Sequence, residues 1–295
     1  MRVVISGVTG FLGSNLANFF ISQGFEVVGI KRPASNLSRL SGISTNSKFA
    51  LVDTENMESI FQSPVNVVIH TATNYGRGGE GAGAIEASNV WLPMKLWQYS
   101  QKNGVVAFFN TDTFMSTETP KEDRYFQYVV TKKQFLAQAK ATLKQSTTKF
   151  INMVVFHMYG ANDNPEKFLA VMAKRMLKNE PEIQLTTGEQ VRDFIYISDV
   201  VAAFAAGLKN LSGFSEFEEF NIGTGQAHAL REVVEYLHKT LGSKSHLAWG
   251  ALENRQHDQI YGAANITGNG KLGWKAEISL ETGLKKTAEY YKNNI

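Results

Sequence analysis

The sequence RVVISGVTGFLGSNLANFF, residues 2–20, decides the fold of this 295-residue chain. Its apolar start predicts a strand over residues 3–6, and the spacing of its later apolar residues predicts a helix over about 11–23. Gly7, Gly10 and Gly13 lie in the turn between them. Such glycines permit a tight turn and let a pyrophosphate approach backbone N–H groups at the positive end of a helix. The stretch therefore predicts nucleotide binding; the alternative is a glycine-rich turn without a ligand.

Short apolar runs alternate with longer helical patterns through the first half of the chain. This alternation is typical of βαβ units and a parallel sheet. We expect strands at residues 3–6, 26–30, 49–52, 65–69, 105–110 and 150–156, and helices at about 11–23, 55–62, 84–102 and 126–145. The sequence thus predicts an α/β protein with a Rossmann-type, doubly wound parallel sheet.

The alternation becomes less regular after Gly160. We expect a helix up to about residue 179, strands at about 181–185, 192–197 and 220–222, and a helix from Ser198 or Asp199 to about 209. These elements predict a dinucleotide-binding domain over residues 1–160, rejoined by about 192–222. A smaller C-terminal substrate-binding lobe is expected over residues 161–295.

The composition excludes several classes of function. The chain has no cysteine, which excludes disulfides, thiolate metal sites and a cysteine nucleophile. Its six histidines are scattered, and they form no metal-ligand motif. The 30 basic and 27 acidic residues are dispersed, so they leave no footprint for nucleic acid. No apolar run reaches the roughly 18 residues that span a bilayer. We expect a cytoplasmic protein that binds no metal, nucleic acid or membrane.

The segment YVVTK, residues 128–132, places a tyrosine and a lysine four residues apart. On a helix, residues at this spacing share a face, so the Lys132 ammonium can lie beside the Tyr128 phenol. A free phenol has a pKa of about 10, and it exchanges protons poorly near neutral pH unless its surroundings help. Because such pairs are common in helices, the role of this one depends on the rest of the chain.

The spacing G-x-x-G-x-x-G together with Tyr-x-x-x-Lys resembles the extended short-chain dehydrogenase/reductase family of nucleotide-sugar epimerases, dehydratases and reductases. The resemblance covers nearly the whole chain. It implies a catalytic trio of Thr111, within NTDTF, Tyr128 and Lys132. Thr111 would donate a hydrogen bond to a carbonyl oxygen, Tyr128 would give the proton in the reductive direction, and Lys132 would favour the phenolate. A strand-end cap is the alternative role for Thr111.

The same resemblance implies the residues that bind the cofactor. They are Gly7, Gly10, Phe11, Leu12 and Gly13 of the turn, Asp53 and Thr54 of LVDTEN, Ala72 of IHTAT, and Phe156 of FHMYG. In GIKRPASN, Lys31 and Arg32 stand where NAD-specific folds usually place an acid for the ribose hydroxyls. Two cations there suit a 2′-phosphate, so NADP(H) is the expected cofactor and NAD(H) the second choice. A solvated basic loop is the alternative.

Substrate contacts are implied by further segments. They are His157 of FHMYG near the sugar, Arg192 of VRDFIYISDV and Arg255 of ENRQHDQIYG near the diphosphate, and Tyr75 and Arg77 of TNYGRGGEG in the sugar pocket. Arg192 could instead form an ion pair with Asp193 or Asp199 that only holds the corner between a strand and a helix.

One departure from the family pattern bears on the reaction. Sugar 4,6-dehydratases of this family carry an Asp-Glu pair after the catalytic threonine, whereas this chain has Asp112-Thr113. Those two carboxyls carry out the elimination of water. Without the glutamate, dehydration is not expected, and simple hydride transfer at a ketone is.

Within the family, NTDTF, YVVTK, TTGEQVRDF and KLGWK are most similar to the CDP-abequose and CDP-paratose synthases. This similarity implies NADPH-dependent reduction of the C4 ketone of a CDP-4-keto-3,6-dideoxyhexose, for bacterial surface polysaccharide. Another nucleotide-linked 4-keto-6-deoxysugar, including a deoxyheptose, is equally compatible with these residues. An NAD-dependent nucleotide-sugar 4-epimerase would use the same trio. A non-catalytic dinucleotide-sensing protein is the alternative from a different class.

A homodimer is also expected from the resemblance. Helices at about 84–102 and 126–145 pair between subunits in many family members. Large apolar side chains at Trp91, Leu92, Trp97 and Phe135 could supply the contact surface. The alternative is that they all pack inward.

Overall fold

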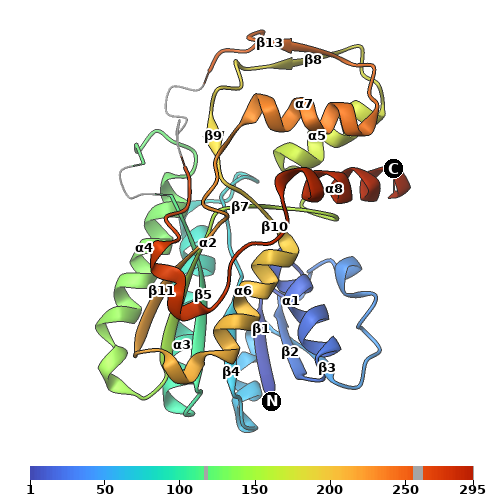
Figure 1. Ribbon diagram of the computed structural model, residues 1–295. Helices are drawn as coiled ribbons and strands as arrows, with labels where there is room; N and C mark the ends of the chain where they lie inside the picture. Colours follow the sequence, from blue (N-terminus) through green and yellow to red (C-terminus); the bar gives the residue numbers. More distant parts are fainter. Residues whose placement is uncertain (116–118, 255–261, 295) are drawn as a thin grey trace. The chain divides into compact units, whose positions relative to one another are not determined.

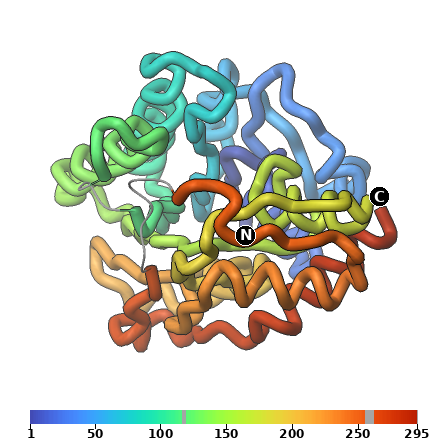
Figure 2. Tube along the Cα trace, turned by 90° about the horizontal axis from the view of Figure 1, so that it is seen from above, coloured from blue at the N-terminus to red at the C-terminus, as the bar shows by residue number. Residues whose placement is uncertain are grey.

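The computed structural model describes residues 1–115, 119–254 and 262–294, and the chain folds into two compact units. Unit 1 contains Met1–Val154, Phe204–Phe220 and Lys271–Gly273, and unit 2 contains Val155–Ala203, Asn221–Gly270 and Trp274–Ile295. The chain therefore leaves unit 1 and returns to it twice, a path that can be followed by colour in Figure 2.

A seven-stranded sheet forms the centre of unit 1 (Figure 1). Its strands are β1 (Arg2–Ser6), β2 (Glu26–Lys31), β3 (Phe49–Asp53), β4 (Val67–His70), β5 (Ala107–Thr113), β6 (Lys149–Val155) and β11 (Phe217–Ile222). They lie in the order β11-β6-β5-β4-β1-β2-β3. β1 pairs in parallel with β2 and β4, β2 with β3, and β4 with β5. The predicted α/β, doubly wound sheet is confirmed.

The strand order places the carboxyl ends of β1 and β4 at the position where ligands bind in doubly wound folds. The order reverses direction between β1 and β4, and crevices at such a switch point lie outside the carboxyl ends of the strands. The glycine-rich turn follows the carboxyl end of β1 directly. β5 extends to Thr113, three residues beyond the predicted end, so Thr111 and Thr113 belong to the strand itself.

Helices pack on both faces of the sheet. The helices of unit 1 include α1 (Phe11–Ser22), α3 (Leu92–Lys102) and α4 (Phe126–Ala141), and α6 (Ile197–Lys209) ends in it. On β5, Phe108 contacts Trp97 of α3 and Phe135 of α4, whereas Phe109 contacts Phe204 of α6. Because successive side chains of a strand point to opposite faces, these contacts place α3 and α4 on one face and the end of α6 on the other.

Two predicted helices differ from the structure in form. Residues predicted as a helix over 55–62 form a 3₁₀ helix, η2 (Thr54–Gln62). The region 84–102 is divided into α2 (Ala82–Glu86), a π-helical turn η3 (Ala87–Trp91) and α3. Pro93 lies at the start of α3, where its missing N–H removes one regular helical hydrogen bond. We attribute the π turn directly before Pro93 to this missing hydrogen bond.

Unit 2 is built from short strand pairs and four helical segments. Its elements are β7 (His157–Tyr159), α5 (Phe168–Leu177), β8 (Glu182–Leu185), β9 (Val191–Arg192), β10 (Phe194–Tyr196), the start of α6, β12 (His228–Ala229), α7 (Leu230–Leu241), β13 (His246–Trp249) and α8 (Leu280–Asn294). The pairs are β7 with β10, β9 with β12, and β8 with β13. α7 packs against both α5 and α8. Shorter 3₁₀ turns are η1 (Ser38–Leu40), η4 (Leu143–Gln145), η5 (Leu211–Gly213) and η6 (Thr267–Leu272).

The predicted dimer surface is wrong for two of its four side chains. Trp97 and Phe135 are fully buried in the core of unit 1, where they contact Phe108 and Phe150. They therefore cannot form a subunit surface. Leu92 is partly buried against the same core, and Trp91 is 64% exposed. The expected homodimer thus depends on Trp91 among these four residues.

Within the described ranges, no helix is both long and apolar enough to cross a bilayer.

Candidate active site

The glycine-rich turn has the shape that a bound pyrophosphate needs. Gly7 has a φ of +70°, and a Cβ atom there would lie 2.6 Å from the backbone of Ala72. A Cβ atom on Gly13 would collide with the carbonyl of Gly7. Gly10 precedes α1 without a side-chain cap, and the first turn holds no acidic residue. The positive end of α1 thus faces no acidic side chain of its own first turn, which fits a dinucleotide phosphate as ligand.

The basic residues after β2 are partly neutralised inside the protein. Lys31 forms an ion pair with Asp53 at 2.5 Å, because the parallel register of β2 and β3 places the two residues opposite each other. Two predicted cofactor residues are therefore paired with each other. Arg39, which the sequence analysis missed, donates to the Thr9 carbonyl of the glycine-rich turn at 3.5 Å. Its signal was a third basic residue in the same loop as Lys31 and Arg32.

The structure brings the predicted trio together at the end of β5 and the start of α4. Tyr128 and Lys132 are both buried, and Lys132 Nζ donates to the Thr111 carbonyl oxygen at 2.5 Å. The Thr111 hydroxyl is buried, and no described residue gives it a hydrogen-bond partner. Thr113, two residues further along β5, is near enough to Tyr128 to affect the pKa of its phenol. Since Thr111 and Thr113 alternate with Asp112, they lie on the same side of the strand.

Burial sets the protonation states of Tyr128 and Lys132. Burial, followed by the neighbouring Tyr75, raises the pKa of Tyr128 well above its ordinary value, while Thr113 and the charge of Arg77 act to lower it. Burial lowers the pKa of Lys132 to about 8, against the opposing effect of Asp112. Near neutral pH the phenol therefore holds its proton and the lysine remains charged. That Lys132 favours the phenolate form of Tyr128 when the cofactor is bound stays a prediction.

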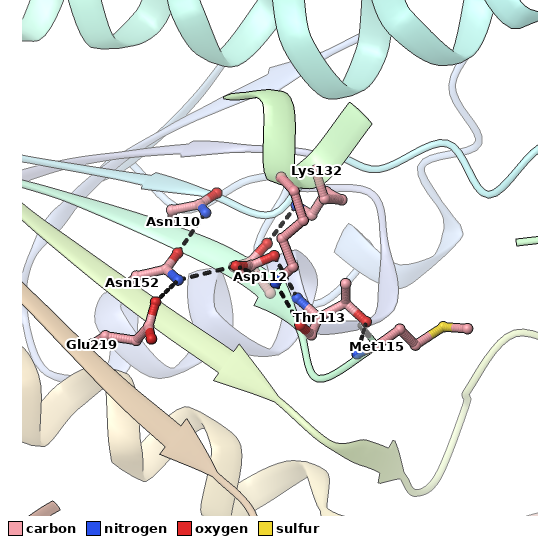
Figure 3. Close-up of polar contacts among 9 residues, drawn as sticks. Asn110, Asp112, Thr113, Met115, Lys132, Asn152 and Glu219 are labelled. Carbon is pink, nitrogen blue, oxygen red and sulfur yellow. Dashed lines mark hydrogen bonds and ion pairs between the residues drawn. The ribbon is translucent and has the colours of Figure 1, made fainter. Parts of the chain in front are cut away.

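Asp112, between Thr111 and Thr113 on β5, is held by a network of polar contacts (Figure 3). Its carboxylate accepts the Thr113 N–H at 2.7 Å and an N–H of Asn152 at 3.0 Å, and it pairs with Lys133 at 3.0 Å. Asn152 also donates to Glu219 at 2.8 Å. Asp112 is only 3% exposed. Its oxygens are thus occupied by donors from the strand, the neighbouring strand and α4.

Tyr75 and Arg77 form a stack that continues from Tyr128. The ring centroids of Tyr75 and Tyr128 lie 4.7 Å apart, and the Arg77 guanidinium lies 4.7 Å from the Tyr75 ring. Arg77 also donates to the Tyr125 hydroxyl at 3.0 Å. A guanidinium over an aromatic face is an attractive contact. The structure therefore brings both predicted pocket residues to Tyr128.

Unit 2 holds Phe156, His157 and Arg192. The N–H of Phe156 donates to Ile222 at 3.0 Å, and that of His157 donates to the Asp193 carbonyl at 3.1 Å. Burial, followed by the positive charges of Arg192 and Lys167, lowers the pKa of His157 to about 3. His157 and Arg192 are thus near each other and near a second cation. Arg255 lies outside the described residues.

Asp193 does not depend on an ion pair to satisfy its carboxylate. It is fully buried and accepts four hydrogen bonds, from the N–H and hydroxyl of Thr224, the N–H of Gly225 and the N–H of Ala264. Four donors fill the acceptor capacity of a carboxylate. Asp199 accepts the N–H of Ile278 at 2.9 Å. The corner between the strand and the helix at Asp193 and Asp199 is therefore stabilised by backbone and hydroxyl donors, without the ion pair to Arg192 that was the alternative role for this arginine.

A hollow in unit 2 was not expected from the sequence. Its lining includes Thr187, Gly188, Arg231 and Trp249. The Arg231 guanidinium lies 4.7 Å from the Trp249 ring. Thr187 and Gly188 belong to the segment TTGEQVRDF, whereas Arg231 and Trp249 come from parts of the chain that no motif marks. Across the residues that the structure describes, no group of three acidic or histidine side chains could hold a metal ion.

His70 lies at the carboxyl end of β4, and its burial leads us to expect that the stability of the protein depends on pH. It is fully buried, shares a hydrogen bond of 2.7 Å with Ser6, and has a pKa lowered by burial and then by the charge of Lys132. The unfolded chain takes up this proton more readily, so stability is present above a pH of about 6.5 and is lost as the pH falls below it.

The variant His70→Asn should therefore lose less stability than the unaltered protein between about pH 7 and about pH 5. Thermal melting across this range measures the difference, and exposed His246→Asn serves as the control. Equal losses of melting temperature in all three proteins would contradict the assignment.

The fold and the catalytic group define a dinucleotide-dependent enzyme of the short-chain dehydrogenase/reductase type. Residues 3–223 match the model of the NAD dependent epimerase/dehydratase family, which is well over half of the chain. The chain belongs to that family.

The relatives include sugar-nucleotide enzymes of two kinds. The chain is 31% identical to the CDP-abequose synthase of Salmonella muenchen, over 97% of this chain and 96% of the relative. It is 26% identical to the UDP-glucuronate 4-epimerase of Thermodesulfobacterium geofontis, over 99% and 96%. Among solved structures, the UDP-glucuronic acid 4-epimerase of Bacillus cereus, in complex with UDP-glucuronic acid and NAD, has a TM-score of 0.86 at 21% identity, with both chains fully covered.

Proposed function

We propose that this protein reduces the C4 ketone of a nucleotide-linked 4-keto-6-deoxysugar with NADPH. The expected substrate is a CDP-4-keto-3,6-dideoxyhexose, used for bacterial surface polysaccharide. The similarity to CDP-abequose synthases over nearly the full length of both chains supports this class of substrate. A buried Tyr128 that holds its proton, and a buried Thr111 hydroxyl for which the described residues offer no hydrogen-bond partner, support the direction of the reaction.

The state of Asp112 is the observation that carries the choice of reduction over dehydration. Elimination of water needs a carboxyl group free to exchange protons near the sugar. Here the Asp112 carboxylate is buried and occupied by Thr113, Asn152 and Lys133. The next residue, Thr113, cannot act as a carboxyl acid or base. The site can therefore donate a proton to a ketone oxygen, but it lacks the pair of carboxyls for elimination.

The residues of the site divide the work of a ketone reduction. A nicotinamide dinucleotide, when bound, supplies the hydride. Gly7, Gly10 and Gly13 shape the turn for its pyrophosphate. Thr111 donates a hydrogen bond to the ketone oxygen as negative charge develops there, and Tyr128 Oη gives that oxygen its proton. Lys132 is oriented by the Thr111 carbonyl and would hold the ribose of the cofactor.

A 4-epimerase is the second candidate, favoured by the epimerases among the relatives and structural neighbours. The two activities differ in their use of cofactor. An epimerase retains tightly bound NAD and regenerates it, whereas a reductase consumes one NADPH for each sugar. Absorbance of the purified protein and NADPH oxidation with a 4-keto-6-deoxysugar nucleotide separate them. Retained NAD together with interconversion of 4-hydroxy sugars would establish the epimerase.

Replacing Lys31 and Arg32 by methionine should raise the KM for NADPH far more than the KM for NADH. Each charge-assisted contact to a phosphate contributes roughly 1.5–3 kcal/mol. Because Lys31 is paired with Asp53, the single variant Arg32→Met should account for the larger share. Steady-state kinetics with both cofactors measure this, with Lys48→Met as the control. Equal use of NADH and NADPH by the unaltered protein would contradict the prediction.

Arg192→Ala should weaken binding of the nucleotide sugar without lowering the melting temperature. A guanidinium matches diphosphate oxygens in a bidentate manner, and this pairing is lost in the variant. The donors to Asp193 come from Thr224, Gly225 and Ala264, so the corner keeps its hydrogen bonds. Calorimetric binding of CDP and thermal melting are the two measurements. Unchanged affinity with a lower melting temperature would show that Arg192 has only a structural role.

A further inference from the structure

The end of β5 extends past the strand beside it. In the pairing of β4 with β5, His70 is the last residue of β4 and lies opposite Asn110, whereas β5 continues to Thr113. β4 therefore offers no backbone partner to residues 111–113. This overhanging end carries Thr111, so the position of the Thr111 hydroxyl depends on what holds these three residues.

Two neighbouring lysines of α4 hold the overhanging end. Lys132 Nζ donates to the Thr111 carbonyl at 2.5 Å, and Lys133 Nζ donates to the Thr113 carbonyl at 3.1 Å. Lys133 also forms an ion pair of 3.0 Å with the Asp112 carboxylate. Each of the three residues at the end of β5 is thus bonded to α4.

The contact of Lys133 with Asp112 is kept in place by further hydrogen bonds. The Asp112 side chain is fully buried, and its carboxylate also accepts from the Thr113 N–H at 2.7 Å and from Asn152 on β6 at 3.0 Å (Figure 3). Asn152 in turn donates to Glu219 on β11 at 2.8 Å. The carboxylate therefore has a set position, and it sets the position of the ammonium that donates to it.

We propose that Lys133 is a positioning residue that fixes the end of β5 against α4, so that the Thr111 hydroxyl and the Tyr128 phenol keep their relative position. A ketone oxygen must meet both groups at once, and small displacements of reacting groups have large effects on rate. The inference deepens the proposed function and rests on it for the identity of that oxygen.

An effect of Lys133 on the charge of Lys132 can be distinguished from this role. Burial, opposed by Asp112, lowers the pKa of Lys132 to about 8, and the charge of Lys133 acts in the same direction as burial. Removing the Lys133 charge thus leaves Lys132 more firmly protonated. A lower turnover of such a variant near neutral pH would therefore report the position of the strand rather than a lost charge on Lys132.

The test compares Lys133→Met, which removes both contacts, with Lys133→Arg, which keeps a charged donor. With NADPH and the 4-keto sugar, Lys133→Met should lower kcat by roughly 10–100-fold with little change in either KM, because both ligands still bind. Lys133→Arg should recover most of the turnover. Lys95→Met, which removes an exposed lysine from α3, is the matched control and should match the unaltered protein.

A second variant separates positioning from stability. Lys133→Met leaves the buried Asp112 carboxylate without its cation, which should lower the melting temperature. The double variant Asp112→Asn/Lys133→Met removes that charge and should regain stability, but its kcat should stay low because the Thr113 carbonyl still lacks its donor. Asp112→Asn alone keeps that donor and should keep most of the turnover. Recovery of kcat together with the melting temperature in the double variant would show that Lys133 only balances a charge, and would overturn the proposal.

Hydrogen–deuterium exchange gives a readout that needs no substrate. Backbone amides of residues 111–115 should exchange faster in Lys133→Met and in the double variant than in the unaltered protein, whereas those of β1 should exchange at the same rate. Unchanged exchange at the end of β5, or unchanged kcat in Lys133→Met, would overturn the proposal. An unaltered protein that reduces no ketone would instead overturn the proposed function, while the exchange experiment would still judge the role of Lys133.

Discussion

Tyr128→Phe is expected to lower turnover of the 4-keto sugar by about 10²–10⁴-fold, the usual range for general acid–base catalysis. The Tyr128 phenol is buried and holds its proton near neutral pH. Because the position is buried, water should not replace the phenol as proton donor in the variant. Phenylalanine keeps the ring contact with Tyr75, whose centroid lies 4.7 Å away. Binding of cofactor and nucleotide sugar should therefore remain close to that of the unaltered protein.

Rapid measurement of kcat together with equilibrium binding of both ligands checks this expectation. Tyr236→Phe, on α7 of unit 2, removes a phenol that belongs to none of the predicted site residues and should leave turnover unchanged. Full activity of Tyr128→Phe would show that another group gives the proton. A parallel loss of ligand affinity would show that the tyrosine acts in binding rather than in the chemical step.

Lys132→Met should be slowed to a comparable degree, by about 10²–10⁴-fold, and should also bind cofactor less tightly. Methionine fills similar space but cannot donate to the Thr111 carbonyl, the hydrogen bond that positions the ammonium at the end of β5. Burial lowers the pKa of Lys132 to about 8, so the side chain is still charged near neutral pH. Burying this charge costs free energy of folding. Replacing it by an apolar side chain should therefore not reduce the melting temperature greatly.

The combination of lost turnover with retained stability separates a catalytic from a structural lysine. Steady-state kinetics, cofactor binding and thermal melting are measured on Lys132→Met and on Lys144→Met, which removes an exposed lysine from η4. The control should match the unaltered protein in all three. A large fall in the melting temperature of Lys132→Met with little change in kcat would contradict the assignment.

Local patterns predicted the parts of the site that depend on neighbouring residues in the chain. Gly7 follows β1 directly, Gly10 precedes α1 and Gly13 lies in its first turn, so the strand, turn and helix were all visible in one short stretch. Tyr128 and Lys132 share a helical face by spacing alone. For the same reason the sheet could be predicted from the alternation of apolar runs and helical patterns.

Contacts between distant segments could not be predicted in this way. The pairing of Lys31 with Asp53 depends on the register of β2 and β3, and the network around Asp112 needs Asn152 on a neighbouring strand. The effect of Thr113 on the pKa of Tyr128 depends on the extension of β5 beyond Asn110. Periodicity also shows that a helix has an apolar face without showing what covers it, which is why Trp97 was wrongly placed at a subunit surface.

The most direct test of the proposed reduction follows the hydrogen atom itself. The protein is incubated with a CDP-4-keto-3,6-dideoxyhexose and NADPH deuterated at both C4 hydrogens, and the product is examined by NMR and mass spectrometry. The account predicts one NADPH oxidised for each sugar, one deuterium at C4 of the product, and no loss of water. An unlabelled product, or interconversion of 4-hydroxy sugars without net oxidation of NADPH, would contradict it.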